Sequence, residues 1–331
     1  CIGMMKPTAL TARYAPPSAA PINANTALQT GIRRGVVGLV LGLVLVALLS
    51  LTRRTVHSAE DLHRLISLSC LSSIPAVRRG KRTRREAPSL LLTHAGTGSD
   101  FSEAMRNLSL KLQRITSKHG AKVVLITSTV PGEGKTTVAS NLALALAAEG
   151  KRVILIDGDL RKQSLKPLFG IGAHSDGLVE VLSGKAKNFR LLPVPDSSLL
   201  LLSGDGTVAQ PQRLLGSPRM GQILELLRQK LDYILIDTPP AGVLSDAAAL
   251  AKYADGAIYV VRQDMANSVQ IVNSVQSLSG AVPLYGCVLN CTQAGTTRSG
   301  YRYGYRYGYQ YGYSSHYSHY SHYSSDAGDR R

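Results

Sequence analysis

The sequence has no tryptophan, only three phenylalanines and only four cysteines among its 331 residues. The cysteines lack the paired spacing of a metal site, and they are too few for a disulfide-stapled fold. Cys287 and Cys291 lie in the apolar stretch GCVLNC and are expected to be buried or half-buried free thiols. The main domain is therefore predicted to be cytoplasmic. The apolar fraction of 44% is that of a protein with a real core.

Acidic residues are also scarce. The sequence contains 21 Asp and Glu and 38 Lys and Arg, which gives a formal net charge of +17. Such an excess indicates contact with nucleic acid or with an anionic membrane surface. The basic residues are unevenly spread, and six of them lie between Arg78 and Arg85 in the stretch RRGKRTRRE.

The uncharged run Gly35–Leu51 would span roughly 26 Å as a helix, slightly less than the hydrocarbon core of a bilayer. Flanking arginines can reach the headgroups, at positions Arg33, Arg34, Arg53 and Arg54. A signal peptide is the alternative, but many residues precede the run and no small-residue cleavage site follows it. We predict a transmembrane helix at residues 34–52.

More basic residues follow this helix than precede it, so the positive-inside rule places the C-terminal part in the cytoplasm. Residues 1–33, with a Pro/Ala-rich stretch, are then an extracytoplasmic remnant, and residues 53–97 are a basic juxtamembrane linker. We expect the linker to bind anionic lipid headgroups, at about 1 kcal/mol per charge, and no specific nucleic acid. A merely solvated linker is the alternative. Because the chain begins with Cys1, we expect it to be a fragment of a longer protein.

From Ser99 onwards, helical periodicity alternates with apolar strands. Residues 99–119 place their apolar side chains on one face, Asp100 and Glu103 resemble a capping box, and Gly120 is a fitting stop. Strand-like Val/Ile/Leu runs then occur in AKVVLITS, KRVILIDGD, DYILIDTPP, GAIYVVR and YGCVLN. This alternation predicts an α/β fold over residues 98–295, with a mostly parallel central sheet flanked by helices.

The stretch TSTVPGEGKTT lies between the first of these strands and a helix. A phosphate-binding loop needs inward backbone N–H groups, a helix N-terminus, a lysine for the β/γ-phosphates and a hydroxyl for Mg²⁺. The expected ATP-phosphate ligands are Gly132, Glu133, Gly134, Lys135, Thr136 and Thr137. Thr129 stands where the strict motif has glycine, so the loop is a variant of the P-loop NTPase motif.

Aspartates end two other predicted strands, Asp157 and Asp159 in VILIDGDLR and Asp237 in YILIDTPP. Ligands of open parallel sheets bind at such strand ends, and Mg²⁺ prefers oxygen ligands and water. A single aspartate there is more often a helix cap. Three of them beside a phosphate loop predict a magnesium-nucleotide site.

The segments VPGEGKTT, ILIDGDLR and ILIDTPP resemble the Walker A, A′ and B motifs of the bacterial protein-tyrosine kinases (BY-kinases) of capsule and exopolysaccharide biosynthesis. The resemblance covers roughly residues 99–295. The upstream part is similar to the end of a polysaccharide chain-length co-polymerase fused to such a kinase. This implies a kinase domain on the cytoplasmic side of a bacterial cytoplasmic membrane.

The resemblance also implies roles for individual residues. Lys135 would hold the β/γ-phosphates of ATP, and Thr136 would hold Mg²⁺. Asp237 would position Mg²⁺ through water, with Asp159 beside the metal. Asp157 would accept the proton of the tyrosine. Implied partners are further subunits in a ring, a polysaccharide polymerase and export machinery, and a cognate tyrosine phosphatase.

Some positions depart from the family pattern. The oligomerisation motif is matched by Glu103 and Arg106, but Ser109 stands at its third position, and an intrahelical Glu103–Arg106 pair is the alternative. Gln163 and Lys166 stand where proline and histidine are expected. These departures concern the stability of the subunit contacts in the ring and not the nucleotide site.

Residues 296–331 form a low-complexity segment that we predict to be a disordered autophosphorylation tail. It contains ten of the fifteen tyrosines, namely Tyr301, Tyr303, Tyr305, Tyr307, Tyr309, Tyr311, Tyr313, Tyr317, Tyr320 and Tyr323. The resemblance implies that this tail enters the active site of the next subunit. Two alternatives remain, a membrane-linked ATPase switch without kinase activity, and a tail that serves adhesion or RNA binding.

Overall fold

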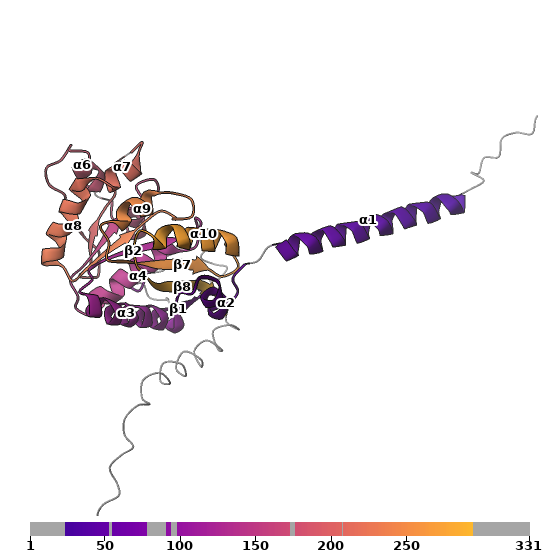
Figure 1. The fold of residues 1–331 in the computed structure, drawn as a ribbon, viewed down its shortest axis with the longest axis horizontal. Helices are drawn as coiled ribbons and strands as arrows, with labels where there is room; N and C mark the ends of the chain where they lie inside the picture. The colour runs from indigo at the N-terminus through magenta and orange to yellow at the C-terminus, as the bar shows by residue number, and fades with distance from the viewer. Residues whose placement is uncertain are drawn as a thin grey trace, which may run out of the picture. The chain divides into compact units, whose positions relative to one another are not determined.

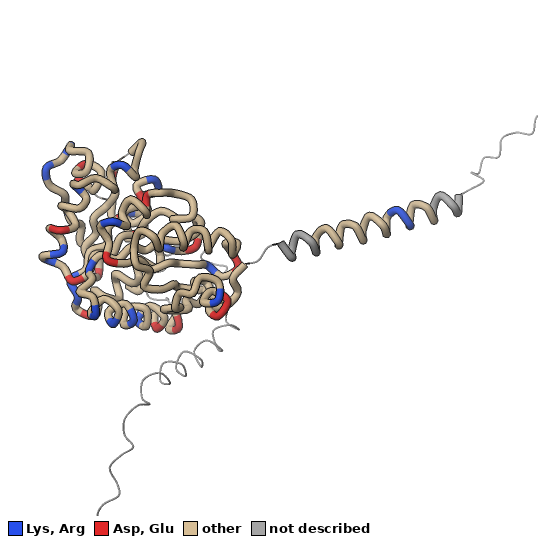
Figure 2. The backbone as a smooth tube through the Cα atoms, viewed as in Figure 1, with Lys and Arg blue, Asp and Glu red and all other residues tan. Residues whose placement is uncertain are grey.

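The computed structural model describes residues 24–52, 55–77, 91–93, 98–172, 176–206 and 208–293, and divides the chain into two compact units, 1–54 and 55–331. The first unit contains helix α1 (Ala24–Thr52), which begins within the segment that we expected to precede the membrane helix. Its window Gln29–Val46 is long and apolar enough to cross a membrane and is fully exposed. Figure 2 shows a single basic stretch on the described part of α1, whereas basic and acidic residues intermingle along the second unit.

The second unit is built on an eight-stranded sheet with the order β1-β8-β7-β2-β6-β3-β5-β4, of which Figure 1 labels β1, β8, β7 and β2. All neighbouring strands pair in parallel except β4 and β5, which confirms the predicted mostly parallel sheet. The strands are β1 (Cys70–Pro75), β2 (Val123–Ser128), β3 (Val153–Asp157), β4 (Leu192–Pro193), β5 (Leu200–Leu202), β6 (Tyr233–Asp237), β7 (Gly256–Arg262) and β8 (Leu284–Thr292).

Helices cover both faces of this sheet. They are α2 (Ala59–Ile66), α3 (Ser99–His119), α4 (Lys135–Ala148), α5 (Leu165–Leu168), α6 (Leu178–Leu182), α7 (Pro211–Leu215), α8 (Pro218–Lys230), α9 (Asp246–Ala251) and α10 (Ser268–Ser279). Alternate strand residues point to opposite faces. Val124 of β2 therefore packs in one core with Leu142 of α4, while Val123 packs in the other with Ile271 of α10.

The folded unit starts well before residue 98, where we expected the kinase domain to begin. Within the predicted 53–97 linker, residues 59–66 form α2, capped by Ser58, and residues 70–75 form β1. Strand β1 pairs with β8 at the edge of the sheet, with Cys70 opposite Cys287. The linker prediction is wrong for these residues because their apolar side chains complete the sheet and its core. The basic cluster at 78–85 lies outside the described residues.

Helix α3 matches the expected span, but its start differs from the prediction. Its N-cap is Gly98, which offers no side-chain hydrogen bond, so Asp100 and Glu103 do not form a capping box. Gly120 ends the helix in the left-handed conformation, with φ of 61°, as expected. Cys287 is buried and Cys291 half-buried, and both are free thiols, as predicted.

Asp255 fixes the start of β2 against α8. Its carboxylate accepts hydrogen bonds from the backbone N–H groups of Lys122 and Val123, at 2.7 and 2.8 Å, and from both terminal nitrogens of Arg228 at 2.8 Å. Burial alone would raise the pKa of Asp255, but these donors outweigh it and lower the pKa. The Asp255 carboxylate therefore fixes the first residues of β2, a central strand of the sheet, in position.

We predict that Asp255→Asn lowers the free energy of unfolding at pH 7 by about 2 kcal/mol, because charge-assisted hydrogen bonds are lost. The folded-state pKa lies below the unfolded value near 4, so this contribution is complete above about pH 4 and disappears as the pH falls through the folded-state pKa. Urea unfolding of the full chain at pH 7 and pH 3.5 measures the difference. Asp196→Asn changes an exposed aspartate and is the control, which should leave the free energy of unfolding unchanged at both pH values. If Asp255→Asn lowered that free energy equally at pH 7 and at pH 3.5, the charge argument would be contradicted.

Candidate functional site

The phosphate loop connects the end of β2 to the start of α4. Gly132 and Gly134 both have φ of 90°, a conformation that favours glycine. A Cβ atom on Gly134 would clash with Nδ2 of Asn290, so a larger residue would displace that side chain. Helix α4 starts at Lys135 without a side-chain cap on its first N–H groups. Such a helix start is suited to bind a phosphate.

Glu133 lies inside the loop and braces it. Its side chain is fully buried, and its carboxylate accepts hydrogen bonds from the backbone N–H groups of Val130 at 2.8 Å and Arg262 at 3.3 Å. Burial raises the pKa of Glu133, and these bonds offset part of the rise. Among the predicted phosphate ligands, Glu133 can therefore contribute only its backbone N–H group.

Two residues that the sequence analysis did not single out hold the loop from neighbouring strands. Asn290 of β8 donates a hydrogen bond to the carbonyl oxygen of Glu133 at 2.8 Å. Arg262 of β7 donates through its guanidinium to the carbonyl oxygen of Gly132 at 3.3 Å. Each is a polar residue at or near the end of an apolar strand, which is the signal that identified the three aspartates.

Lys135 points toward the aspartates at the neighbouring strand ends. Its ammonium nitrogen donates to Asp159 Oδ2 at 3.2 Å and to Thr136 Oγ1 at 3.3 Å, and lies 3.7 Å from Asp237 Oδ1. Burial would lower the pKa of Lys135, but Asp237 and Asp159 raise it above its ordinary value. Lys135 is therefore a fixed, fully charged cation beside the phosphate loop.

Asp157 and Asp237 stand side by side, as register partners at the ends of β3 and β6. Burial raises the pKa of Asp237 to about 6 against the opposing effect of Lys135. Burial, reinforced by Asp237, also raises the pKa of Asp157 well above its ordinary value. Asp159 is also buried and accepts a hydrogen bond from the N–H group of Lys162 at 3.0 Å. The structure thus brings the three carboxylates together beside Lys135 of the phosphate loop, and their roles there stay predictions.

Carboxylate oxygens of this cluster fit a magnesium ion. Both oxygens of Asp237 are buried and accept no hydrogen bond, although the Lys135 ammonium lies 3.7 Å from Oδ1. Buried charged oxygens without hydrogen-bond donors are costly, so a cation would stabilise them. Among the described residues, no group of three or more His, Cys, Asp or Glu side chains is placed to hold a metal ion by itself. Mg²⁺ commonly uses one or two carboxylates together with water and substrate phosphates.

Glu103 and Arg106 lie apart from this cluster, on the exposed side of α3. None of the ion pairs in the described part of the chain joins them, so the alternative of an intrahelical pair finds no support. Ser109, at the third position of the motif, is buried and donates to Glu149 Oε2 at 3.3 Å. The role of α3 in a ring stays a prediction. The tail tyrosines 301–323 lie outside the described residues.

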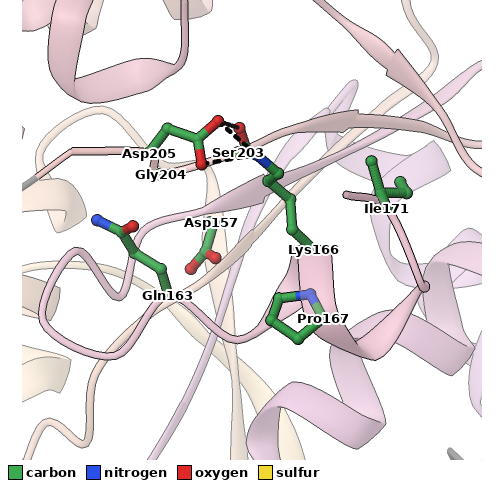
Figure 3. Close-up of a pocket in the computed structure, with 8 residues that line it drawn as sticks. All are labelled: Asp157, Gln163, Lys166, Pro167, Ile171, Ser203, Gly204 and Asp205. Carbon is green, nitrogen blue, oxygen red and sulfur yellow. Dashed lines mark hydrogen bonds and ion pairs between the residues drawn. The ribbon is translucent and has the colours of Figure 1, made fainter. Parts of the chain in front are cut away.

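A cavity of about 260 Å³ is lined in part by Asp157. Figure 3 shows Asp157 between Gln163 and Lys166, among the residues that line this cavity. The phosphate loop and the cavity therefore both lie at the carboxyl-terminal edge of the parallel strands.

The comparisons with known proteins agree with this geometry. Residues 120–301 match a family model described as ParA, NUBPL iron-transfer P-loop NTPase. The chain is 32% identical over 274 residues to the putative tyrosine-protein kinase EpsB of Ralstonia solanacearum, covering 81% of this chain and 36% of that protein. It is 37% identical over 171 residues to the tyrosine-protein kinase CpsD of Streptococcus pneumoniae serotype 4, covering 51% of this chain and 75% of CpsD.

Among solved structures, the kinase domain of the Escherichia coli tyrosine kinase ETK superposes with a TM-score of 0.63 at 25% identity, covering 76% of this chain and 95% of that domain. The chain spans only about a third of the length of the first curated relatives that it matches, 36% in each case. Its described second unit nevertheless contains the phosphate loop and the aspartates that follow β3 and β6. The chain belongs to the bacterial tyrosine-protein kinases, a family with the P-loop NTPase fold.

Proposed function

We propose that this chain is a Mg-ATP-dependent protein-tyrosine autokinase whose substrates are its own C-terminal tyrosines. The observation that carries the proposal is the ion pair of Lys135 with Asp237 beside a phosphate loop, next to Asp157, whose buried Oδ1 accepts no hydrogen bond. Phosphoryl transfer needs little covalent help from a protein, so positioning and charge neutralisation suffice. The site offers both, in a buried environment where charges act strongly.

Different side chains of the site act on the phosphoryl donor, ATP, and on the acceptor, a tyrosine hydroxyl. Lys135 binds the β/γ-phosphates, and Thr136, Asp237 and Asp159 hold Mg²⁺, which neutralises phosphate charge when bound. Asp157 accepts the phenol proton, while the phenol oxygen forms a bond to the γ-phosphorus. The bond from that phosphorus to the β,γ-bridging oxygen breaks, and ADP leaves. The raised pKa of Asp157 suits a carboxylate that must accept a proton.

The cellular setting is part of the same proposal. Helix α1 would anchor the chain in the bacterial cytoplasmic membrane, with the second unit in the cytoplasm. The resemblance to kinases of capsule and exopolysaccharide biosynthesis supports regulation of polysaccharide polymerisation and export as the biological role. A ring of identical subunits, a cognate phosphatase and anionic lipid headgroups are the proposed partners.

The main alternative is an ATPase switch that phosphorylates no protein, and the match to the ParA family model is the observation that favours it. Fold does not decide between the two functions. The ten tyrosines of the tail favour the kinase, because a switch would not need them.

We predict that Lys135→Met reduces both phosphotyrosine formation and ATP hydrolysis by at least about 100-fold, the cost of losing a charge that stabilises the transition state. Incubation of the detergent-solubilised full chain with Mg-ATP, followed by phosphotyrosine and phosphate-release assays, measures both. Lys187→Met removes an exposed lysine and should leave both activities unchanged. Equal activity of Lys135→Met and the control would rule out the proposed site.

Replacement of all ten tail tyrosines by phenylalanine separates the kinase from the switch. We expect the variant to hydrolyse ATP but to gain no phosphotyrosine, because the catalytic cluster is intact and the acceptor hydroxyls are missing. Mass spectrometry of the unchanged chain should place phosphate on residues 301–323. ATP hydrolysis by the unchanged chain without any phosphotyrosine would instead identify the switch.

Phosphorylation should also change the assembly state. Residues 301–331 contain four Arg and two Asp, a formal charge of +2, and each phosphotyrosine adds about −1.5 to −2. A few modifications therefore reverse the sign of the tail, and we expect the resulting repulsion to loosen a ring. Light scattering before and after Mg-ATP, with the all-phenylalanine variant as control, tests this; an assembly of constant size despite modified tails would contradict it.

A further inference from the structure

Two free cysteines face each other across neighbouring strands at the edge of the sheet. Strand β1 pairs in parallel with β8 at this edge (Figure 1), and Cys70 is the direct partner of Cys287 in the pairing. Neighbouring strands lie about 4.8 Å apart, and the Cα atoms of a disulfide are usually about 4.4–6.8 Å apart. The backbones of the two strands therefore already have the spacing that a disulfide requires.

The side chains of the two cysteines also meet. The thiol of Cys287 donates to the carbonyl oxygen of Ser69 at 3.6 Å, so its sulfur is directed toward β1 at the residue before Cys70. The thiols of Cys70 and Cys287 are hydrogen-bonded to each other. A bond between the two sulfur atoms therefore requires a local movement of two side chains and no new pairing of the strands.

The two cysteines differ in exposure and in charge. Cys70 is half-buried, whereas Cys287 is fully buried. The hydrogen bond with Cys287 lowers the pKa of Cys70 against the opposing effect of burial, and the ammonium group of Lys111 adds to this lowering. That ammonium group donates to the carbonyl oxygen of Leu71, the residue after Cys70, at 2.6 Å. The contact with Cys70 and burial raise the pKa of Cys287.

These differences assign an order of reaction to the two thiols. The thiolate is the nucleophilic form of cysteine, and access to the reagent also limits the reaction. Cys70 has both the lower pKa and the greater exposure, so it is the thiol that would react first. Cys287 is then positioned to attack the modified sulfur of Cys70 from the neighbouring strand.

The pair lies at a connection within the folded unit. Strand β1 is at the edge of the sheet, so β8 is its single neighbour among the eight described strands. On the same strand β8, three residues beyond Cys287, Asn290 donates to the carbonyl oxygen of Glu133 in the phosphate loop. A disulfide would therefore join β1, the first strand after helix α1 in the sequence, covalently to a strand that braces the phosphate loop.

We propose that Cys70 and Cys287 are a redox-modifiable pair, which a peroxide converts into a disulfide between β1 and β8. The Cys70 thiolate attacks one peroxide oxygen, the O–O bond breaks, and the leaving hydroxide takes up the proton that Cys70 had released, giving water. The Cys287 sulfur then attacks the sulfur of the resulting Cys70 sulfenic acid. The S–S bond forms, hydroxide leaves, and the proton of Cys287 converts it to a second water.

The balance of this reaction is two thiols oxidised by two electrons and one peroxide reduced to two waters. A dithiol reductant reverses it by thiol–disulfide exchange. In a reducing compartment such a disulfide is transient, as expected of a redox-sensing pair and not of a structural bridge. The modification site goes beyond the proposed kinase function and does not depend on it.

The first test maps the bond. The reduced full chain in detergent is treated with hydrogen peroxide, its remaining thiols are blocked with N-ethylmaleimide, and its peptides are analysed by mass spectrometry. We expect a Cys70–Cys287 link as the main product, which dithiothreitol removes. Cys291→Ser removes a half-buried thiol of the same strand and is the matched control, which should form the link equally well. Two thiols that both remain open to maleimide, or a main product that joins other cysteines, would overturn the proposal.

The order of reaction is tested with one cysteine at a time. In Cys287→Ala the reaction should stop at the sulfenic acid of Cys70, which dimedone labels. In Cys70→Ala the buried thiol of Cys287 should stay unlabelled at the same peroxide concentration. Circular dichroism checks that both variants are folded. Equal labelling of the two variants, or labelling of Cys287 alone, would overturn the assignment of Cys70 as the first thiol to react.

Thermal unfolding tests whether the disulfide fits the native sheet. The bond closes the long loop from residue 70 to residue 287, which restricts the unfolded chain, so we expect Tm to rise by at least about 5 °C on oxidation. Dithiothreitol should reverse the rise, and peroxide should produce none in Cys70→Ala. A linked chain with an unchanged or lower Tm would contradict a disulfide that forms within the paired strands.

Discussion

The site depends on the burial of three carboxylates around one ammonium group. Asp157, Asp159 and Asp237 are each at most 6% exposed, and Lys135 is the cation that contacts two of them. One positive charge cannot neutralise three negative charges, so the unliganded cluster is electrostatically unfavourable. A magnesium ion would relieve that imbalance, and a phosphate group would occupy the start of α4. Binding of Mg-ATP should therefore stabilise the folded unit as well as prepare the reaction.

The parallel sheet explains why residues so distant in the sequence meet. Parallel strands direct their carboxyl ends to one edge, so the ends of β2, β6 and β3 bring the loop and the aspartates together. The same rule made the site predictable, because long apolar strands ending in aspartate are visible in the sequence. It also places Arg262 and Asn290 next to the loop. They were missed because a phosphate motif does not show which residues brace it from outside.

The parts of the fold that could not be predicted are those with weak local signals. Strand β1, CLSSIP, contains two serines and a proline, so only its pairing with β8 identifies it as a strand. The start of α3 was misread because Asp100 and Glu103 have capping-box spacing, whereas Gly98 occupies the cap. The Lys166–Asp205 contact joins segments 39 residues apart in sequence, and no periodicity reveals such a pair.

The last described residues of the chain lie at the same edge of the sheet. Strand β8 ends beside the phosphate loop, where Asn290 contacts Glu133, and the N–H group of Gln293 donates to Gln263 at 2.9 Å. The chain that leads to Tyr301 therefore leaves from the catalytic edge of the sheet. Eight residues reach at most about 28 Å when fully extended. On the proposed function, a tether of that length would keep the tail tyrosines at a high effective concentration near the catalytic edges of adjoining subunits.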